Sequence, residues 1–333
     1  MRKRYITLIS LFALFIILLI SIKMIKGAIS PAGTSGEERF IEFRVENGES
    51  TSKVAERLYE EGIIKSRFLF KIIAKTKGVD KKIKAGLYHL SANMSTMEVL
   101  GILANGAIYT IDVTVPEGFT MEMIAKRLSE KGLIDEKRFL ELCHSPELFD
   151  GIPEEAKTLE GYLFPDTYRF SPDATEEEII KTMIGKFKSV YEDVSKGYNG
   201  KLNENQIITL ASIIEKEAYL DREKPVISAV FQNRLKKGMR LESCATVLYV
   251  VRRPNGPVYY ADLKVDSPYN TYKYSGLPPG PISCPGARSI ESALYPENND
   301  YLYFVSLGDG THHFSKTFAE HEKYRLGKVS PVR

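Results

Sequence analysis

The sequence predicts an α+β protein with a single transmembrane helix at its N-terminus, a small module of two strands and two helices, and a larger α+β domain. Three observations lead to this fold class. Residues 5–22 carry no charge, strand and helix patterns alternate between 40 and 90, and helical patterns with a short apolar run follow residue 151. Apolar side chains recur about every 3.6 residues in a helix and every second residue in a strand, which separates the two patterns.

The composition excludes some classes of protein. The 333 residues are 43% hydrophobic and 27% charged, the balance of an ordinary globular protein rather than a disordered one. Residues 1–36 hold five basic residues and no acidic ones, and the other 41 basic residues face 43 acidic ones. Nucleic-acid-binding proteins usually concentrate positive charge on one surface, so we expect no nucleic-acid partner.

Residues 1–26 are expected to form a cytoplasmic tip and a membrane anchor. The uncharged run at 5–22 nearly spans a bilayer core at about 1.5 Å per residue, and Lys23 and Lys26 can reach the interface. A cleaved signal peptide is the alternative, although its apolar region should be shorter. The basic residues at 2–4 predict a cytoplasmic N-terminus in the cell membrane and an extracytoplasmic body. Small, turn-forming residues at 27–38 predict a linker.

The first small module is expected at 39–108. Ser50 can cap a helix whose apolar positions follow the helical period, and glycine is typical after a helix end. The predicted elements are a strand at 40–45, a helix from Ser50 to Gly62, a helix from Ser66 to about Lys75, and a strand at 86–90.

A second small module is predicted at 109–150 because residues 115–134 repeat the pattern of 45–64. Such a pattern can arise by chance, but several matches at one offset favour related modules. The matching pairs are Gly48 and Gly118, Ser50 and Thr120, Ala55 and Ala125, Arg57 and Arg127, Leu58 and Leu128, Gly62 and Gly132, and Ile64 and Ile134.

The three cysteines permit one disulfide and one free thiol in an oxidising compartment. Cys244 and Cys284 both lie in turn-rich stretches, whereas Cys143 ends a helical pattern. A Cys244–Cys284 disulfide and three unpaired buried thiols remain alternatives, because spacing does not identify pairing.

The most informative helix is predicted from the cap Asn203 to Ala218. With Ile207 at zero and about 100° per residue, Glu217 falls at about 280°, inside the apolar face of this helix. A carboxyl group among apolar side chains is costly to ionise, so the pKa of Glu217 should rise. A general acid for glycosidic cleavage needs such an environment. The alternative is a structural ion pair between Glu217 and a buried arginine, Arg234 or Arg240.

Ten further segments carry a family resemblance. They are EGYLFPDTY (160–168), ASIIEKE (211–217), VFQNRL (230–235), GMRL (238–241), ATVLY (245–249), SPYNTY (267–272), GLPPGPI (276–282), PGA (285–287), YLYF (301–304) and HHF (312–314). The chain resembles the MltG (YceG-like) family of membrane-anchored endolytic peptidoglycan transglycosylases, and the first module resembles a LysM-like module. The resemblance implies a catalytic domain at 151–333.

In that family the second glutamate of the Glu-Lys-Glu triplet is catalytic, which implies Glu217. The implied reaction cleaves the MurNAc-β-1,4-GlcNAc bond of nascent strands to give 1,6-anhydro-MurNAc ends, with one glutamate as acid and then base. A lysozyme-like hydrolase would need a second carboxylate, for which the sequence offers Asp221, Glu223, Asp262 and Asp266. A glycan-binding cell-wall scaffold without activity is the other alternative.

The matching motifs also suggest residues that bind the glycan. They are Asn233, Thr246, Tyr249, Asn270, Tyr272 and His312. For Thr246 and Tyr249, packing is a competing interpretation. Adjacent histidines at 312 and 313 do not have zinc-ligand spacing, so no metal and no cofactor are expected. The expected partners are peptidoglycan strands, the membrane and, from the family, cell-wall synthases.

Overall fold

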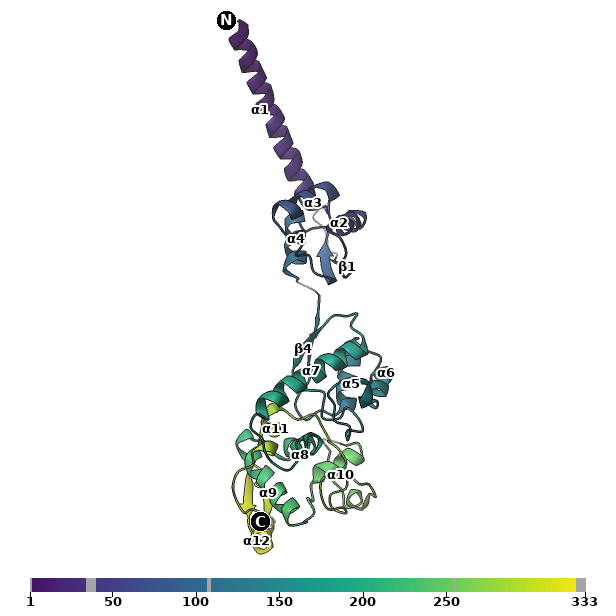
Figure 1. The fold of residues 1–333 in the computed structure, drawn as a ribbon, viewed down its shortest axis with the longest axis vertical. Coiled ribbons are helices and arrows are strands. Elements are labelled where there is room, and N and C mark those ends of the chain that lie inside the picture. The colour runs from purple at the N-terminus through teal and green to yellow at the C-terminus, as the bar shows by residue number, and fades with distance from the viewer. Residues whose placement is uncertain (1, 34–39, 107–108, 254–255, 328–333) are drawn as a thin grey trace, which may run out of the picture. The chain divides into compact units, whose positions relative to one another are not determined.

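The computed structural model describes residues 2–33, 40–106, 109–253 and 256–327. The chain divides into two compact units (Figure 1). Unit 1 contains Met1–Ile111 and Ser171–Asp173, and unit 2 contains Asp112–Phe170 and Ala174–Arg333. Helices and three two-stranded sheets make up the described ranges, which confirms a mixed α+β fold. The predicted division into five segments stays a prediction, and its boundaries near residues 38 and 108 lie outside the described residues.

The N-terminal helix corrects one expectation. Helix α1 covers Arg2–Ile29. Nowhere in the described ranges is a helix both long enough and apolar enough to cross a bilayer, so the predicted single transmembrane helix is wrong. A spanning helix needs about 20 consecutive apolar residues, whereas the uncharged run of α1 is 18 residues long and ends before Lys23. The predicted linker at 27–38 is helical up to Ile29, and its residues 34–38 lie outside the described residues.

Unit 1 has the predicted strand–helix–helix–strand order. Ser50 caps the first helix by accepting the Lys53 N–H, and the two strands pair antiparallel from Phe40 opposite Ser91 to Val45 opposite Gly86. Buried Phe43, Leu58, Phe70, Tyr88 and Leu103 form its core. The elements after α1 are β1 (Phe40–Val45), α2 (Thr51–Glu60), α3 (Arg67–Thr76), β2 (Gly86–Ser91) and α4 (Thr96–Asn105).

The repeated sequence pattern folds a second time in the same way. Thr120 caps the second copy as Ser50 caps the first, and both copies turn after the first helix at a glycine with φ of 70°, Gly62 or Gly132. The second copy is longer than the pattern suggests, because β3 pairs with β4 beyond residue 150. Its elements are β3 (Ile111–Thr114), α5 (Met121–Glu130), α6 (Glu136–Cys143), the short η1 (Pro146–Leu148) and β4 (Thr167–Phe170).

This second copy is joined to the rest of unit 2 by backbone hydrogen bonds. The Gly118 N–H donates to the Cys284 carbonyl at 2.9 Å, and the Cys284 N–H donates to the Phe119 carbonyl at 2.7 Å. The second βααβ copy therefore belongs to the same compact body as the C-terminal helices.

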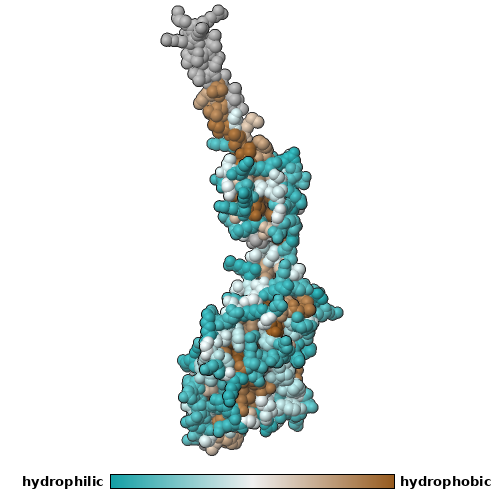
Figure 2. Space-filling view, in the orientation of Figure 1, coloured by the Kyte–Doolittle hydropathy of each residue, from teal (hydrophilic) through white to brown (hydrophobic). Residues whose placement is uncertain are grey.

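The centre of unit 2 is α8 (Glu204–Glu217), which contacts α9, α10 and α11 (Figure 1). Asn203 is the predicted cap and forms a capping box with Gln206, and Ile207 to Ile214 are all buried. The face of unit 2 visible in Figure 2 is largely hydrophilic, with hydrophobic patches among the polar residues. The surrounding elements are α7 (Glu176–Val194), η2 (Asp221–Glu223), α9 (Lys224–Lys236), α10 (Cys244–Val250), η3 (Asp262–Lys264), α11 (Ala287–Leu294), β5 (Tyr303–Ser306), β6 (His312–Ser315) and α12 (Phe318–Gly327).

Candidate active site

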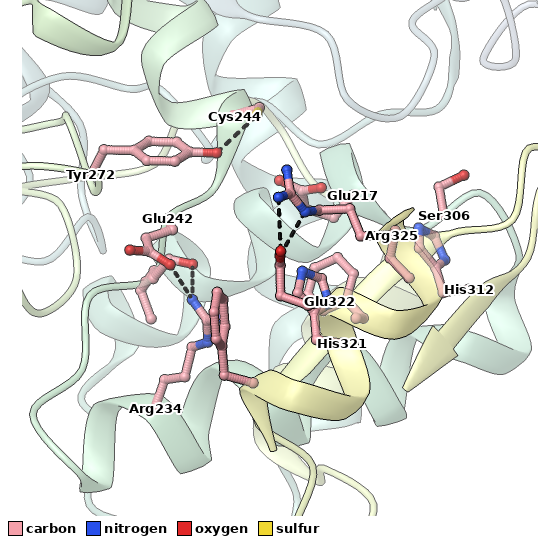
Figure 3. A pocket seen from close by; sticks show the side chains of 14 residues that line it. Glu217, Arg234, Glu242, Cys244, Tyr272, Ser306, His312, His321, Glu322 and Arg325 are labelled. Atoms are coloured by element: carbon pink, nitrogen blue, oxygen red, sulfur yellow. Dashed lines mark hydrogen bonds and ion pairs between the residues drawn. The ribbon is translucent and has the colours of Figure 1, made fainter. Parts of the chain in front are cut away.

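A cavity of about 640 Å³ in unit 2 begins where α8 ends (Figure 3). Its walls come from α8, α9, α10, β5, β6 and α12, so segments more than 100 residues apart meet around one space. The lining residues are Glu217, Arg234, Leu241, Glu242, Cys244, Tyr272, Phe304, Val305, Ser306, His312, Phe318, His321, Glu322 and Arg325.

Glu217 is the last residue of α8, and its carboxyl group faces this cavity. Burial raises the pKa of Glu217, which is the direction that the helical pattern predicts. The Ser243 hydroxyl, the nearby His312 and the Ala245 N–H act in the opposite direction by stabilising the carboxylate. Ser243 Oγ donates to Glu217 Oε1 at 2.5 Å. The carboxyl group can thus hold a proton, and the polar groups around it can stabilise the carboxylate that forms when the proton leaves.

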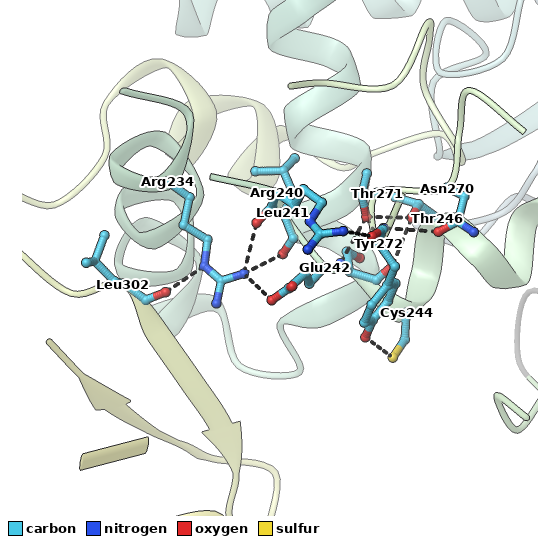
Figure 4. A network of polar contacts seen from close by, with 11 residues as sticks. Arg234, Arg240, Leu241, Glu242, Cys244, Thr246, Asn270, Thr271, Tyr272 and Leu302 are labelled. Carbon is cyan, nitrogen blue, oxygen red and sulfur yellow. Dashed lines mark hydrogen bonds and ion pairs between the residues drawn. The ribbon is translucent and has the colours of Figure 1, made fainter. Parts of the chain in front are cut away.

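Neither arginine weighed from the sequence pairs with Glu217. The Arg234 guanidinium is buried and binds Glu242 Oε2 at 3.2 Å and the carbonyls of Leu241 and Leu302 (Figure 4). Arg240 donates to the Tyr272 carbonyl at 2.7 Å. The structural ion-pair interpretation of Glu217 is therefore not supported.

His312 reaches the cavity from β6 and is fixed by an acid on the far side. Its Nδ1 lies 2.7 Å from Glu223 Oε2, and its backbone N–H donates to Glu223 Oε1 at 3.2 Å. Both side chains are largely buried, at 8% and 11% exposure, so water competes little for this contact. His312 is thereby held where it can act on Glu217. In the part of the chain described, no three His, Cys, Asp or Glu side chains are grouped to hold a metal.

Tyr272 also lines the cavity, and it contacts a cysteine there. The Tyr272 hydroxyl lies 3.0 Å from Cys244 Sγ, at the start of α10 (Figures 3 and 4). The structure thus brings together Glu217, Tyr272 and His312 from the residues that the sequence suggested.

The other suggested glycan-binding residues lie elsewhere. Asn233 donates to the Asn299 and Tyr301 carbonyls, and Asn270 donates to the Leu263 and Val265 carbonyls. Thr246 is fully buried. Its hydroxyl donates to the Ser243 carbonyl and lies 2.9 Å from the Thr271 hydroxyl oxygen. These three side chains hold loops around the site. Tyr249 lines a different cavity.

The possible Cys244–Cys284 disulfide is absent from the structure, where all three cysteines are free. Cys244 is exposed at the start of α10, whereas Cys284 is buried with its Sγ 3.8 Å from Glu160 Oε1. Of the two alternatives, the structure has the unpaired thiols, with Cys244 exposed rather than buried.

The roles of two residues at this site differ from what the sequence indicates. Ser243 stands at the N-cap position of α10, where a serine usually accepts a helix N–H, but its side chain makes no cap bond and donates to Glu217 instead. The sequence indicates Glu223 only as a candidate second carboxylate of a hydrolase, whereas the structure places it against His312. A serine before a helical pattern was the available signal for Ser243, and none identified the Glu223–His312 contact across 89 residues.

Comparison with known proteins gives a consistent result. The YceG-like family matches residues 43–325. The endolytic murein transglycosylase of Bacillus subtilis (strain 168) is 36% identical over 307 residues, covering 87% of this chain and 85% of that protein. Its counterpart in Streptococcus pneumoniae (strain ATCC BAA-255 / R6) is 29% identical over 324 residues, covering 87% and 58%. A crystal structure of a yceG-like protein from Listeria monocytogenes aligns with a TM-score of 0.58 and 36% identity, covering 86% of this chain and 100% of that one.

Proposed function

Because this chain belongs to the YceG-like family, we propose that it is an endolytic murein transglycosylase with Glu217 as its catalytic residue. The names of the Bacillus and Streptococcus relatives support the activity. The observation that carries the assignment of Glu217 is a carboxyl group in a cavity, with its pKa raised by burial and a serine hydroxyl 2.5 Å away. No other acid that lines this cavity has that combination.

In the first half of the reaction, Glu217 donates its proton to the oxygen that joins N-acetylmuramic acid to the next N-acetylglucosamine. The C1–O bond breaks, the glucosamine leaves with the proton, and positive charge develops at C1. The Glu217 carboxylate that remains is stabilised by the Ser243 hydroxyl and by the Ala245 N–H at the positive end of α10.

In the second half, the same carboxylate accepts the proton of the muramic C6 hydroxyl, whose oxygen closes on C1. The product is a 1,6-anhydro sugar, Glu217 is protonated again, and no water is consumed. One carboxyl group therefore serves as acid and then as base, for which a pKa near the working pH is suited.

The placement of the other acids supports a single catalytic carboxyl group. Within the cavity, Glu242 pairs with Arg234 and Glu322 pairs with Arg325. The four acids considered for hydrolysis are also engaged: Asp221 with Lys224, Glu223 with His312, Asp262 with Arg253, and Asp266 with Lys273. A hydrolase would need one of these to activate water or to form a covalent intermediate.

The deciding experiment treats uncross-linked glycan strands with the full chain and identifies the new ends by mass spectrometry. We expect internal cuts that end in 1,6-anhydromuramic acid, and Glu217→Gln should remove them while keeping the fold. The matched control is Glu204→Gln, at the opposite end of α8, which should cut normally. Reducing ends would indicate a hydrolase, and a folded, glycan-binding chain that never cuts would indicate a scaffold.

Two further parts of the proposal rest on the family alone. We propose that the first βααβ module binds glycan as LysM-like modules do, and that the chain works outside the cytoplasm beside a cell-wall synthase. A pull-down of the full chain from growing cells tests the second part, and the absence of synthase enrichment would contradict it. Loss of glycan binding by isolated unit 2, relative to the full chain, tests the first.

A further inference from the structure

A second cavity, of about 550 Å³, lies within unit 2 and shares no lining residue with the cavity at Glu217. Helix α10 joins the two. Cys244 at its start lines the first cavity, and Tyr249 and Val250 at its end line the second, about 7.5 Å further along at 1.5 Å per residue. The residues lining the second cavity are Thr120, Met121, Glu122, Met123, His144, Thr158, Tyr249, Val250, Arg252, Ser267 and Tyr269.

Both ends of α10 carry an unusual backbone conformation. Glu242 and Arg252 each have φ of 54°, and among the described residues no other amino acid except glycine has a positive φ. This left-handed conformation costs a side chain free energy that glycine avoids, and it is retained most often at functional sites. Glu242 lines the first cavity and Arg252 lines the second. At Arg252 this conformation ends α10, because the Arg252 N–H donates to the Tyr249 carbonyl and the Arg253 N–H donates to the Leu248 carbonyl.

Two tyrosine rings form the aromatic wall of the second cavity. The ring centroids of Tyr249 and Tyr269 lie 5.3 Å apart, with the rings tilted by 44°. The Tyr249 hydroxyl binds the carboxyl group of Glu160, which is buried and also accepts the Met121 N–H at 3.2 Å. Glu160 takes no part in the reaction proposed above, and it fixes the orientation of this wall from behind.

Polar groups of several kinds surround the aromatic wall. The hydroxyls of Thr158 and Ser267 donate and accept hydrogen bonds, the Glu122 carboxylate accepts them, and the exposed Arg252 guanidinium donates them. A cavity of this volume with aromatic faces and a few polar groups is the common form of a small-molecule site. A sugar ring fits this chemistry, because it has apolar faces for tyrosine and hydroxyl or acetamido groups at its edge.

We propose that the second cavity binds an N-acetylated sugar ring of the same glycan strand, away from the bond that is cut at Glu217. The inference rests on the proposed function and adds a distal binding site to it. An enzyme that cuts inside a strand must hold the polymer beyond the broken bond, and α10 connects the two places where it would do so. Strands long enough to reach both cavities should therefore bind more tightly than short ones.

The test measures affinity for uncross-linked glycan oligomers of defined length, with full-length Glu217→Gln so that the strands stay intact. Adding Tyr269→Leu should weaken binding of long oligomers about tenfold or more, which corresponds to about 1.4 kcal/mol, and leave the shortest oligomers unchanged. In the active chain the same substitution should raise KM for long strands and preserve kcat. The control is Tyr260→Leu, an 87% exposed tyrosine that lines neither cavity.

Arg252→Gly is a second variant, which tests the binding site without destabilising the fold. Glycine adopts φ of 54° freely, so the thermal midpoint should equal or exceed that of the wild type while affinity for long strands falls. Unchanged long-strand affinity in both variants, or equal weakening for short and long oligomers, would overturn the inference. Length-dependent weakening in a chain that never cuts would keep the distal site and refute the transglycosylase proposal, so the two failures are distinguishable.

Discussion

Removing the Ser243 hydroxyl should change the pH dependence of strand cleavage in a direction that the structure fixes. This hydroxyl donates to Glu217 Oε1 at 2.5 Å and lowers the pKa of Glu217 against the rise caused by burial. A hydrogen bond to a charged group contributes about 1.5–3 kcal/mol. Since about 1.4 kcal/mol corresponds to one pH unit, Ser243→Ala should move the titration of Glu217 upward by about one to two pH units.

The assay is the rate of strand cleavage at limiting substrate between pH 4 and 10. In the proposed reaction Glu217 must be protonated to donate, so activity should fall on the alkaline side as Glu217 ionises, and this limb should move to higher pH in Ser243→Ala. The maximal rate should also fall, because the carboxylate formed in the first step loses a partner. Ser195→Ala, at the end of α7 and outside the cavity, is the control. An alkaline limb that stays in place or moves to lower pH would refute the assignment of Glu217 as general acid.

Three other predictions concern stability and reactivity. Arg234→Leu should lower the free energy of unfolding by about 2–4 kcal/mol in urea titrations, because it leaves buried carbonyls without a donor; a change under 1 kcal/mol would contradict this. Burial raises the pKa of Glu160 to about 8, so the free energy of unfolding of the wild type should fall by about 1.4 kcal/mol per pH unit between about pH 4.5 and 8. This pH dependence should be absent in Glu160→Gln. If the variant keeps it, Glu160 is not its source. A thiol reagent should label only Cys244 in the native chain and, without reductant, all three cysteines after denaturation. A single labelled thiol in the denatured chain would show that two cysteines form a disulfide.

Local structure was predictable wherever the signal lies within one turn or one period. Ser50 and Asn203 cap their helices as expected, and α8 ends at Glu217, one residue before the predicted Ala218. Caps depend on hydrogen bonds to N–H groups two or three residues ahead, which a sequence displays directly. The orientation of Glu217 followed from helical periodicity for the same reason.

Contacts between distant segments were not predictable in this way. The partner of β3 is β4, more than 50 residues later, and the intervening helices give no signal of that pairing. Motif residues such as Asn233 and Asn270 resemble glycan-binding groups in sequence, but their side-chain amides donate hydrogen bonds to backbone carbonyls instead. A side-chain amide can serve either role, and only the three-dimensional neighbourhood decides.

The two βααβ copies have the same topology, but they are not interchangeable parts. In the second copy, the turn at Gly118 and Phe119 exchanges two backbone hydrogen bonds with Cys284, and Glu160 accepts the first N–H of α5. A chimera with the unit 1 copy in this position would keep the internal core of the repeat, but it would lose these hydrogen bonds to the rest of unit 2. The second copy is thus part of the support of the catalytic domain, and its sequence is constrained by contacts with that domain as well as by its own fold.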